Sequence, residues 1–150
     1  MPESESDFHW VIARNTCSVD RIFEKLRLDV KSDVEMRQKL RDPLPPPENG
    51  FHYGFSFSSN GSKFSASLKG RSLNHAIIFA LTENYIIVSD ENDKELFKAS
   101  VALSNDGQCR LVVGAVELEG WQFRKKALEK LFFSTAQAPD WFAKFGGHQS

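Results

Sequence analysis

Two carboxylates at the end of a predicted strand are the residues best placed for acid–base chemistry. In segment 108–118 the inward-facing parity is Cys109, Leu111, Val113 and Ala115, and Glu117 and Glu119 continue it. If the strand stays regular, both carboxylates point inward near Trp121, where an apolar cavity would favour the protonated form that a general acid or ligand anchor requires. If Gly114 instead marks a bulge, or the strand ends early, both side chains reach solvent and carry no such role.

Motifs that usually identify an enzyme class are missing. The sequence has no phosphate loop, dinucleotide fingerprint, H-E-x-x-H helix or G-x-S-x-G nucleophile elbow. Its histidines, His9, His52, His75 and His148, are scattered, with no two at ligand spacing. We therefore expect no metal site and no cofactor.

The two cysteines, Cys17 and Cys109, lie far apart and form no C-x-x-C motif. Their spacing is compatible with a disulfide, but the chain opens with an acidic, polar stretch that does not resemble a signal peptide. A cytoplasmic location is the resulting expectation, and in that reducing compartment Cys109 would be an inert buried thiol.

Aromatic residues are concentrated on the predicted inner face of the sheet. Such a face either packs as a solid core or lines an apolar pocket. The candidate ligand-binding residues are Trp10, Tyr53, Phe55, Phe57, Phe64 and Trp121.

Two features near the C-terminus are candidate contacts for a protein partner. The first is a basic helix face, which is also what an ordinary solvated face looks like. The second is an aromatic cluster that either packs on the body of the domain or anchors a partner. The residues are Arg124, Lys125, Lys126 and Lys130 for the face, and Trp141, Phe142 and Phe145 for the cluster.

Charge and hydropathy exclude two classes of partner. The formal net charge is −1, which argues against the basic footprint of a nucleic-acid-binding protein. No apolar run approaches the length of a membrane span, so we expect no membrane insertion. The 150 residues suit a single domain, 1–150, with a disordered N-terminus at 1–7, a proline-rich connector at 42–50 and an aromatic tail at 134–150.

The elements that must position these residues follow from the hydrophobic pattern. Residues 8–13 alternate like a strand, and an apolar stripe at spacings of three and four then predicts a helix from a cap at Thr16 or Ser18 to about Arg41. This helix is either continuous or broken into two near Asp29–Ser32, where helix-forming residues are fewer. Six antiparallel strands and a C-terminal helix with Phe123, Ala127, Leu128, Leu131 and Phe132 on one face complete the order.

Turn residues predict the pairing of two hairpins. A two-residue turn at Asn60-Gly61 would pair Phe57 with Phe64, Phe55 with Ala66 and Tyr53 with Leu68. A three-residue loop with Gly107 in the left-handed conformation would pair Leu103 with Cys109, Val101 with Leu111 and Ala99 with Val113.

Together these elements predict an α+β fold: a curved antiparallel meander of about seven strands, with a helical segment after the first strand and a C-terminal helix packed on the sheet. That order, with the phrase Thr16-Cys17-Ser18-Val19-Asp20-Arg21-Ile22-Phe23-Glu24-Lys25-Leu26, resembles the helix-grip topology of START and Bet v 1-like domains. The resemblance implies a sheet wrapped around the last helix and no universal catalytic motif. The last helix here is shorter and more basic than in that family.

Four functions fit the sequence. The favoured hypothesis is a non-catalytic interaction domain that acts through a protein partner or as a homodimer. A carrier of a small apolar ligand, held between the sheet and the C-terminal helix, is the second. A small cyclase- or hydrolase-like enzyme would use the same cavity with Glu117 and Glu119 as acid and base. The fourth is a secretion chaperone or immunity-type protein.

Overall fold

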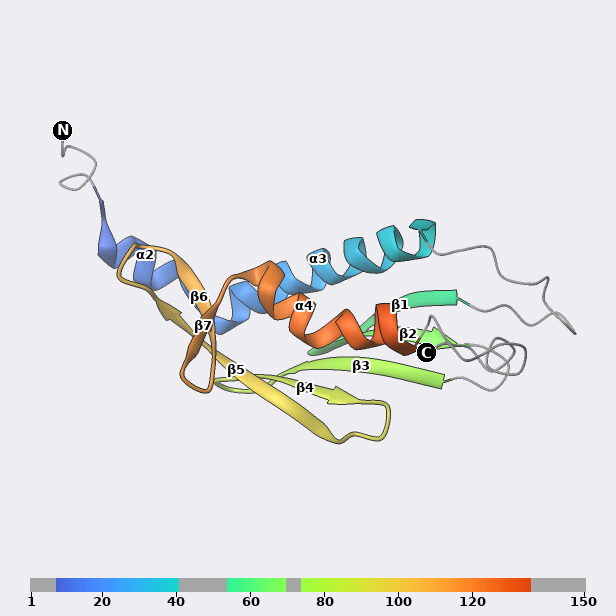
Figure 1. The fold of residues 1–150 in the computed structure, drawn as a ribbon. Helices are drawn as coiled ribbons and strands as arrows, with labels where there is room; N and C mark the ends of the chain where they lie inside the picture. Colours follow the sequence, from blue (N-terminus) through green and yellow to red (C-terminus); the bar gives the residue numbers. More distant parts are fainter. Residues whose placement is uncertain (1–7, 41–53, 70–73, 136–150) are drawn as a thin grey trace, which may run out of the picture.

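The computed structural model describes residues 8–40, 54–69 and 74–135 as an α+β fold (Figure 1). Seven antiparallel strands form one sheet in chain order, so every strand pairs with its sequence neighbours. The strands are β1 Gly54–Asn60, β2 Lys63–Lys69, β3 Asn74–Leu81, β4 Ile86–Asp90, β5 Glu95–Leu103, β6 Cys109–Val113 and β7 Val116–Leu118. The helices are α2 Trp10–Thr16, α3 Val19–Leu40, α4 Gly120–Lys130 and the π-helix η1 Leu131–Thr135. The predicted fold class is confirmed.

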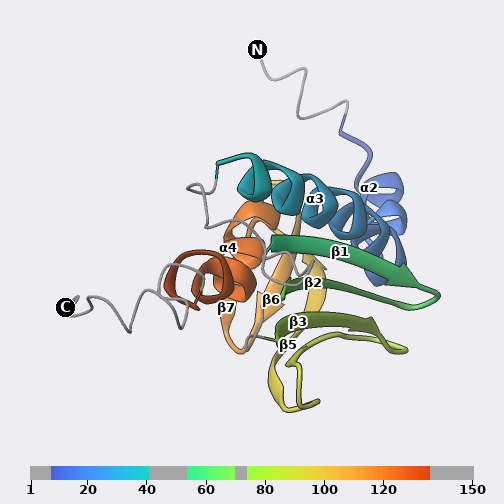
Figure 2. The same cartoon turned by 90° about the vertical axis from the view of Figure 1, so that its right-hand side faces the viewer.

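Both long helices lie on the same side of the curved sheet (Figure 2). α3 runs along β1, where the backbone N–H of Phe55 donates to Oε1 of Gln38 at 2.8 Å. Four phenylalanine rings join the layers, with centroid distances of 4.9 Å for Phe23–Phe64, 4.7 Å for Phe64–Phe79 and 6.2 Å for Phe79–Phe123. The space between helices and sheet is thus occupied by core side chains.

The helical stripes predicted from spacing are confirmed. Val19–Leu40 is one unbroken helix whose buried residues are Phe23, Leu26, Val30 and Val34. Ser18 is its cap, since its Oγ accepts a hydrogen bond from the backbone N–H of Arg21 at 3.3 Å. In the C-terminal helix the predicted apolar face is buried throughout: Phe123, Ala127, Leu128, Leu131 and Phe132.

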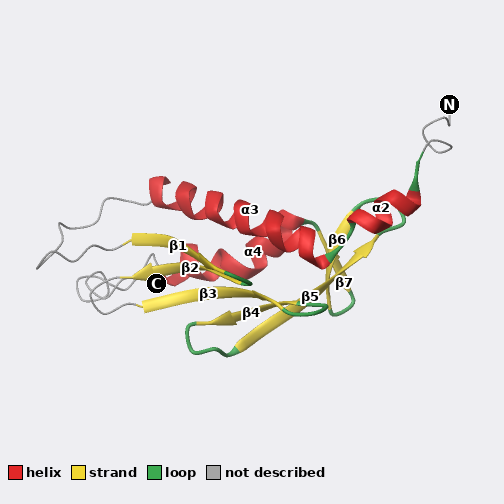
Figure 3. Ribbon diagram, turned by 180° about the vertical axis from the view of Figure 1, so that it is seen from behind, coloured by secondary structure: helices red, strands yellow, loops and turns green. Residues whose placement is uncertain are grey.

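The predicted first strand is wrong, because residues 10–16 form α2. None of its residues is buried, and Trp10 and Ile12 are more than 60% exposed. No residue of α2 is buried, so no core face selects the extended conformation, and the sheet ends at β7 on this side (Figure 3). The strand that would open a helix-grip sheet is therefore replaced by a helix.

The sheet still has seven strands, because the predicted strand 108–118 folds into two. Gly114 has φ +62°, and Val113 pairs with Val116 across a two-residue turn. β7 consequently runs back along β6 instead of continuing it.

The predicted register of the first hairpin is also wrong. Phe55 pairs with Leu68, Phe57 with Ala66 and Ser59 with Phe64, so Gly61 and Ser62 form the turn in place of Asn60 and Gly61. Among these residues only Gly61 has a positive φ, at +62°, which fits a turn with glycine at its first central position. The pairing moves by two residues, which leaves every side chain on its predicted face.

The β5–β6 register is as predicted over the residues that pair. Leu103 lies opposite Cys109 and Val101 opposite Leu111, and Gly107 has φ +85°. The N–H of Gly107 donates to the carbonyl of Ser104 at 2.9 Å, which closes the turn.

Cys17 and Cys109 are joined by a disulfide, contrary to the expectation of free thiols. Their Cα atoms lie 5.3 Å apart, a distance typical of bonded pairs. The junction between α2 and α3 is thereby attached to the start of β6, across 92 residues of sequence. Phe8 covers the turn between β5 and β6, where its ring lies against Gly107.

Several predictions fall on segments outside the described residues: the disordered N-terminus at 1–7, the connector at 42–50 and all but the start of the tail at 134–150. They stay predictions. None of the described helices combines the length and hydropathy needed to cross a membrane.

Candidate functional site

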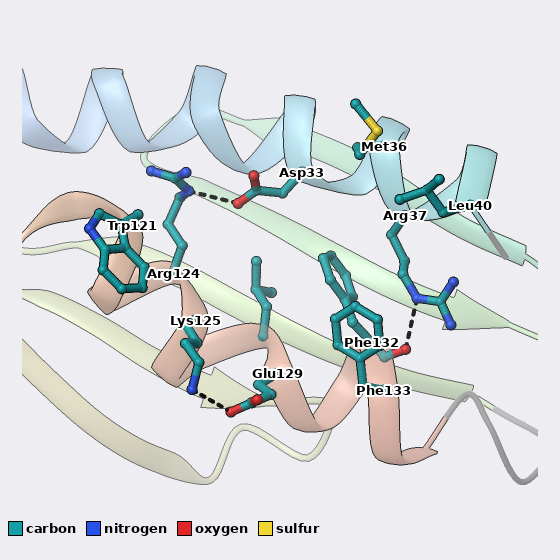
Figure 4. A pocket seen from close by; sticks show the side chains of 11 residues that line it. Asp33, Met36, Arg37, Leu40, Trp121, Arg124, Lys125, Glu129, Phe132 and Phe133 are labelled. Atoms are coloured by element: carbon teal, nitrogen blue, oxygen red, sulfur yellow. Dashed lines mark hydrogen bonds and ion pairs between the residues drawn. The ribbon is translucent and has the colours of Figure 1, made fainter.

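A groove lies between α3 and α4 on the described surface, and we name it the α3–α4 groove (Figure 4). Its cavity volume is about 390 Å³. It is lined by Asp33, Met36, Arg37 and Leu40 from α3, by Trp121, Arg124, Lys125, Leu128 and Glu129 from α4, and by Phe132 and Phe133 from η1.

Helical periodicity places these residues on facing sides of the two helices. On α3, Met36 and Leu40 are four residues apart and therefore share one face, away from the stripe that packs on the sheet. On α4, Trp121, Lys125 and Leu128 repeat at intervals of four and three. Each wall of the groove is one face of a regular helix.

Four of the twelve exposed large apolar side chains in the described part of the chain line this groove. Met36 is 53% exposed, Leu40 68%, Trp121 55% and Phe133 50%. Single exposed apolar residues are ordinary, whereas a contiguous group around a concavity marks a binding surface.

Ion pairs fix the two walls at a set separation. Nε of Arg124 lies 2.6 Å from Oδ2 of Asp33, and one terminal nitrogen of Arg124 lies 3.5 Å from Oδ2 of Asp29. Within the α4 wall, Nζ of Lys125 lies 3.0 Å from Oε1 of Glu129. The polar groups of the groove are mostly paired with each other, so the unsatisfied surface there is apolar.

Arg37 closes the end of the groove nearest η1. Its Nε donates to the backbone carbonyl of Phe132 at 2.9 Å. Its guanidinium carbon lies 5.1 Å from the ring centre of Phe55 and 4.9 Å from that of Phe133. Arg37 therefore holds Phe133 at the groove and joins α3 to the π-helix.

The candidate acid–base pair does not face a cavity. Glu117 and Glu119 are both exposed, because the turn at Gly114 reverses the chain. Oε1 of Glu117 accepts a hydrogen bond from Oγ of Ser104 at 2.7 Å. Glu119 caps α4, and Nε1 of Trp121 donates to its Oε1 at 3.2 Å. Both carboxylates take part in local structure at the edge of the sheet.

The candidate ligand-binding aromatics are divided among three environments. Phe55 and Phe64 are buried in the core, and Phe57 packs against Phe64 with ring centres 5.9 Å apart. Trp10 is exposed on α2, and Trp121 lies on the α3–α4 groove. Tyr53 lies outside the described residues. They do not converge on one pocket.

The basic residues of α4 have intramolecular contacts. Arg124 and Lys125 form the ion pairs given above, and Nζ of Lys126 lies 5.1 Å from the ring centre of Phe97. Lys130 is exposed at the end of α4. The aromatic candidates Trp141, Phe142 and Phe145 lie outside the described residues.

Sequence reasoning missed Met36, Leu40 and Phe133 as site residues. A signal was present: Met36 and Leu40 are apolar at a spacing of four on the side of the helix where charged residues are expected. A second apolar face on an amphipathic helix indicates a second contact.

Within the described residues there is no group of three or more His, Cys, Asp or Glu side chains that could hold a metal ion. Comparison of the chain with family models, curated proteins and solved structures finds no match. The function must therefore be argued from the groove itself.

Proposed function

We propose that this protein is a non-catalytic interaction domain that binds an apolar helical segment of a protein partner in the α3–α4 groove. The observation that carries the proposal is the line of four half-exposed apolar side chains, Met36, Leu40, Trp121 and Phe133, around one groove. Burying a fully exposed side chain of this kind contributes roughly 1.5–3 kcal/mol to the free energy of binding. These four are about half exposed, so each contributes about half of that.

The form of the groove favours a helix as the bound element. Two helices form its walls, and a third helix laid between them buries its apolar side chains at intervals of three and four. Trp121 is a suitable anchor, because truncating an interface tryptophan commonly costs about 2 kcal/mol or more.

The charges at the groove support an apolar partner over an acidic or basic one. Asp33 is paired with Arg124, and Glu129 with Lys125. Both signs are present in equal number in these pairs, so the surface does not select a strongly charged segment.

Site-specific photo-crosslinking tests this function. A photoreactive amino acid replaces Met36 in the full chain, and the matched control carries it at Leu96, which is 44% exposed on β5. We expect a discrete protein adduct at Met36 that is absent at Leu96 and that disappears when Leu40→Asp is added. Equal labelling at both positions, or no adduct at Met36 in the cells of origin, contradicts the proposal.

A second candidate, carriage of a small apolar ligand, is supported by the volume of the groove. About 390 Å³ lies within the roughly 300–1,000 Å³ of small-molecule sites. Such a site would lie outside the sheet–helix space that the helix-grip resemblance implies, because Phe64, Phe79 and Phe123 occupy that space. A native mass spectrum beside a denatured one tests it: an adduct of a few hundred daltons lost on denaturation supports carriage, and a bare mass opposes it.

The disulfide favours an oxidising compartment over the cytoplasm that the sequence predicts. A bonded Cys17–Cys109 pair is the state that an oxidising compartment maintains, whereas the cytoplasm keeps thiols reduced. Alkylation of the protein directly on lysis of its cells tests this point. Blocked thiols support an oxidising compartment, and two alkylated cysteines support the cytoplasm.

A further inference from the structure

We infer that the chain's own segment 139–145 binds in the α3–α4 groove and competes there with the partner. This inference rests on the proposed function, since it concerns the same groove, and it adds a regulatory contact to it. The segment reads Pro139-Asp140-Trp141-Phe142-Ala143-Lys144-Phe145 and contains three aromatic residues.

The chain leaves the described structure at the groove itself. Phe132 and Phe133 line the groove and belong to η1, which ends at Thr135. From Phe133 back to Trp121 the groove runs about 18 Å along the helix axis, at 1.5 Å per residue. The six residues from Thr135 to Trp141 span roughly 20 Å when extended, so Trp141 reaches most of the length of the groove.

The side chains of the segment match what the groove presents. Trp141 and Phe145 are four residues apart, the interval at which Met36 and Leu40 stand on α3 and Trp121 and Lys125 on α4. Asp140 and Lys144 supply one charge of each sign, as the pair Lys125–Glu129 does on the α4 wall of the groove. The segment therefore has the apolar anchors and the balanced charge that the groove accepts.

Attachment favours this segment over a second copy of the chain. A short linker holds its binding group at an effective concentration in the millimolar range, far above that of a free protein partner. A partner must then displace the segment, which lowers the apparent affinity of the domain until displacement occurs.

The methionines give a direct test, because the chain has only Met1 and Met36. With ¹³C-methyl-methionine in the full chain, the Met36 methyl reports on the groove and the Met1 methyl is an internal reference. We expect nuclear Overhauser contacts from the Met36 methyl to the Trp141 indole, unchanged on dilution. Trp141→Ala should move the Met36 resonance by more than its linewidth, whereas Trp10→Ala, on exposed α2, should leave it in place.

Three outcomes overturn the inference. The first is a Met36 resonance identical in wild type and Trp141→Ala, with no contact to the indole. The second is a set of contacts to segment 41–53, which leaves α3 at Leu40. The third is contacts that weaken on dilution, which would place a second copy in the groove. In each case the photo-crosslink at Met36, carried out in the Trp141→Ala variant so that the segment does not compete, decides the proposed function separately.

A gain in dye binding provides a second readout in the full chain. If the segment covers the groove, Trp141→Ala combined with Phe145→Ala should raise the fluorescence of a hydrophobic dye, and adding Leu40→Asp should cancel the gain. An unchanged signal in the double variant opposes the inference.

Discussion

Three arginines each join one helix to another element. Arg27 connects α3 to the turn between β1 and β2, Arg37 connects α3 to η1, and Arg124 connects α4 to α3. The guanidinium groups of Arg27 and Arg37 also lie over phenylalanine rings, so these two contribute through contact as well as through charge.

Arg27 offers the clearest prediction at this scale. Its terminal nitrogens donate to Oγ of Ser59 and, at 2.7 Å, to the carbonyl of Gly61, while its guanidinium carbon lies 5.2 Å from the ring centre of Phe23. Arg27→Ala should lower the free energy of unfolding by about 1–3 kcal/mol, because the turn loses hydrogen bonds from a charged donor and the rings of Phe23 and Phe64 lose their cover.

Urea unfolding measures this change. Arg21→Ala is the matched control, since Arg21 is exposed on the same helix and should change stability by less than about 0.5 kcal/mol. Equal effects of the two substitutions would show that Arg27 does not hold the hairpin.

At the scale of elements, the turns determine which predictions from the sequence succeed. The β5–β6 register was predictable, because a shift of one residue would have turned the apolar residues outward and Gly107 fixed the loop length. The β1–β2 register was not, because a shift of two residues keeps Phe55 and Phe57 on the same face. Hydrophobic alternation determines the face of a strand, and only the conformation of the turn determines the partner.

The groove lay beyond sequence reasoning for a different physical reason. Met36 is on α3 and Trp121 on α4, and all seven strands lie between these helices in the sequence. The proximity of the two residues therefore depends on the angle at which the helices pack. The apolar face that buries each helix was readable from spacing alone. The second face of each helix becomes part of a groove only when the Arg124–Asp33 ion pair holds the helices together.

The β4–β5 turn should make stability depend on pH. Oδ1 of Asp90 accepts backbone hydrogen bonds from Lys94 at 3.0 Å and Asn92 at 2.9 Å. The bond from the Lys94 backbone, followed by that from Asn92, holds the pKa of Asp90 below the ordinary value of an aspartate. A carboxyl whose pKa is depressed in the folded state stabilises the fold above its unfolded pKa, and this stabilisation is lost as pH falls through the folded pKa.

We therefore expect the urea midpoint of the wild type to fall as pH decreases below about 4, the unfolded pKa of aspartate. Asp90→Asn keeps an oxygen acceptor but does not titrate, so the fall should be shallower in that variant. Asp106 is held in the same way by Arg110 and by the backbone of Gln108, which lower its pKa, so Asp90→Asn/Asp106→Asn should flatten the profile further. Parallel profiles for wild type and both variants would contradict this account.

At the scale of the whole molecule, α3 connects two ends with different attachments. Its first turn follows Cys17, whose disulfide to Cys109 fixes it to β6, and its last two turns carry Met36 and Leu40 at the groove. The 22 residues of α3 span about 33 Å, so the two ends are separated by most of the length of the domain. A change at the disulfide should consequently alter stability and leave the groove intact.

Removal of the disulfide tests whether the two ends of α3 act independently. A crosslink across 92 residues removes much of the entropy of the unfolded chain, and the loop-closure relation gives about 4–5 kcal/mol for a loop of this length. We expect Cys17→Ser/Cys109→Ser to lose about 2–5 kcal/mol of unfolding free energy, measured by urea unfolding against the oxidised wild type. α2 has no buried residue, so its amides should exchange with solvent faster once the bond is gone.

The Met36 methyl resonance provides the matched measurement at the other end of α3. It should stay in place in the double serine variant under conditions where the fold persists, because neither cysteine lines the groove. A loss below about 1 kcal/mol would mean that packing around α2 and β6 already supplies the constraint. A Met36 resonance that moves with the disulfide would show instead that α3 transmits the state of one end to the other, and the groove would then be under redox control.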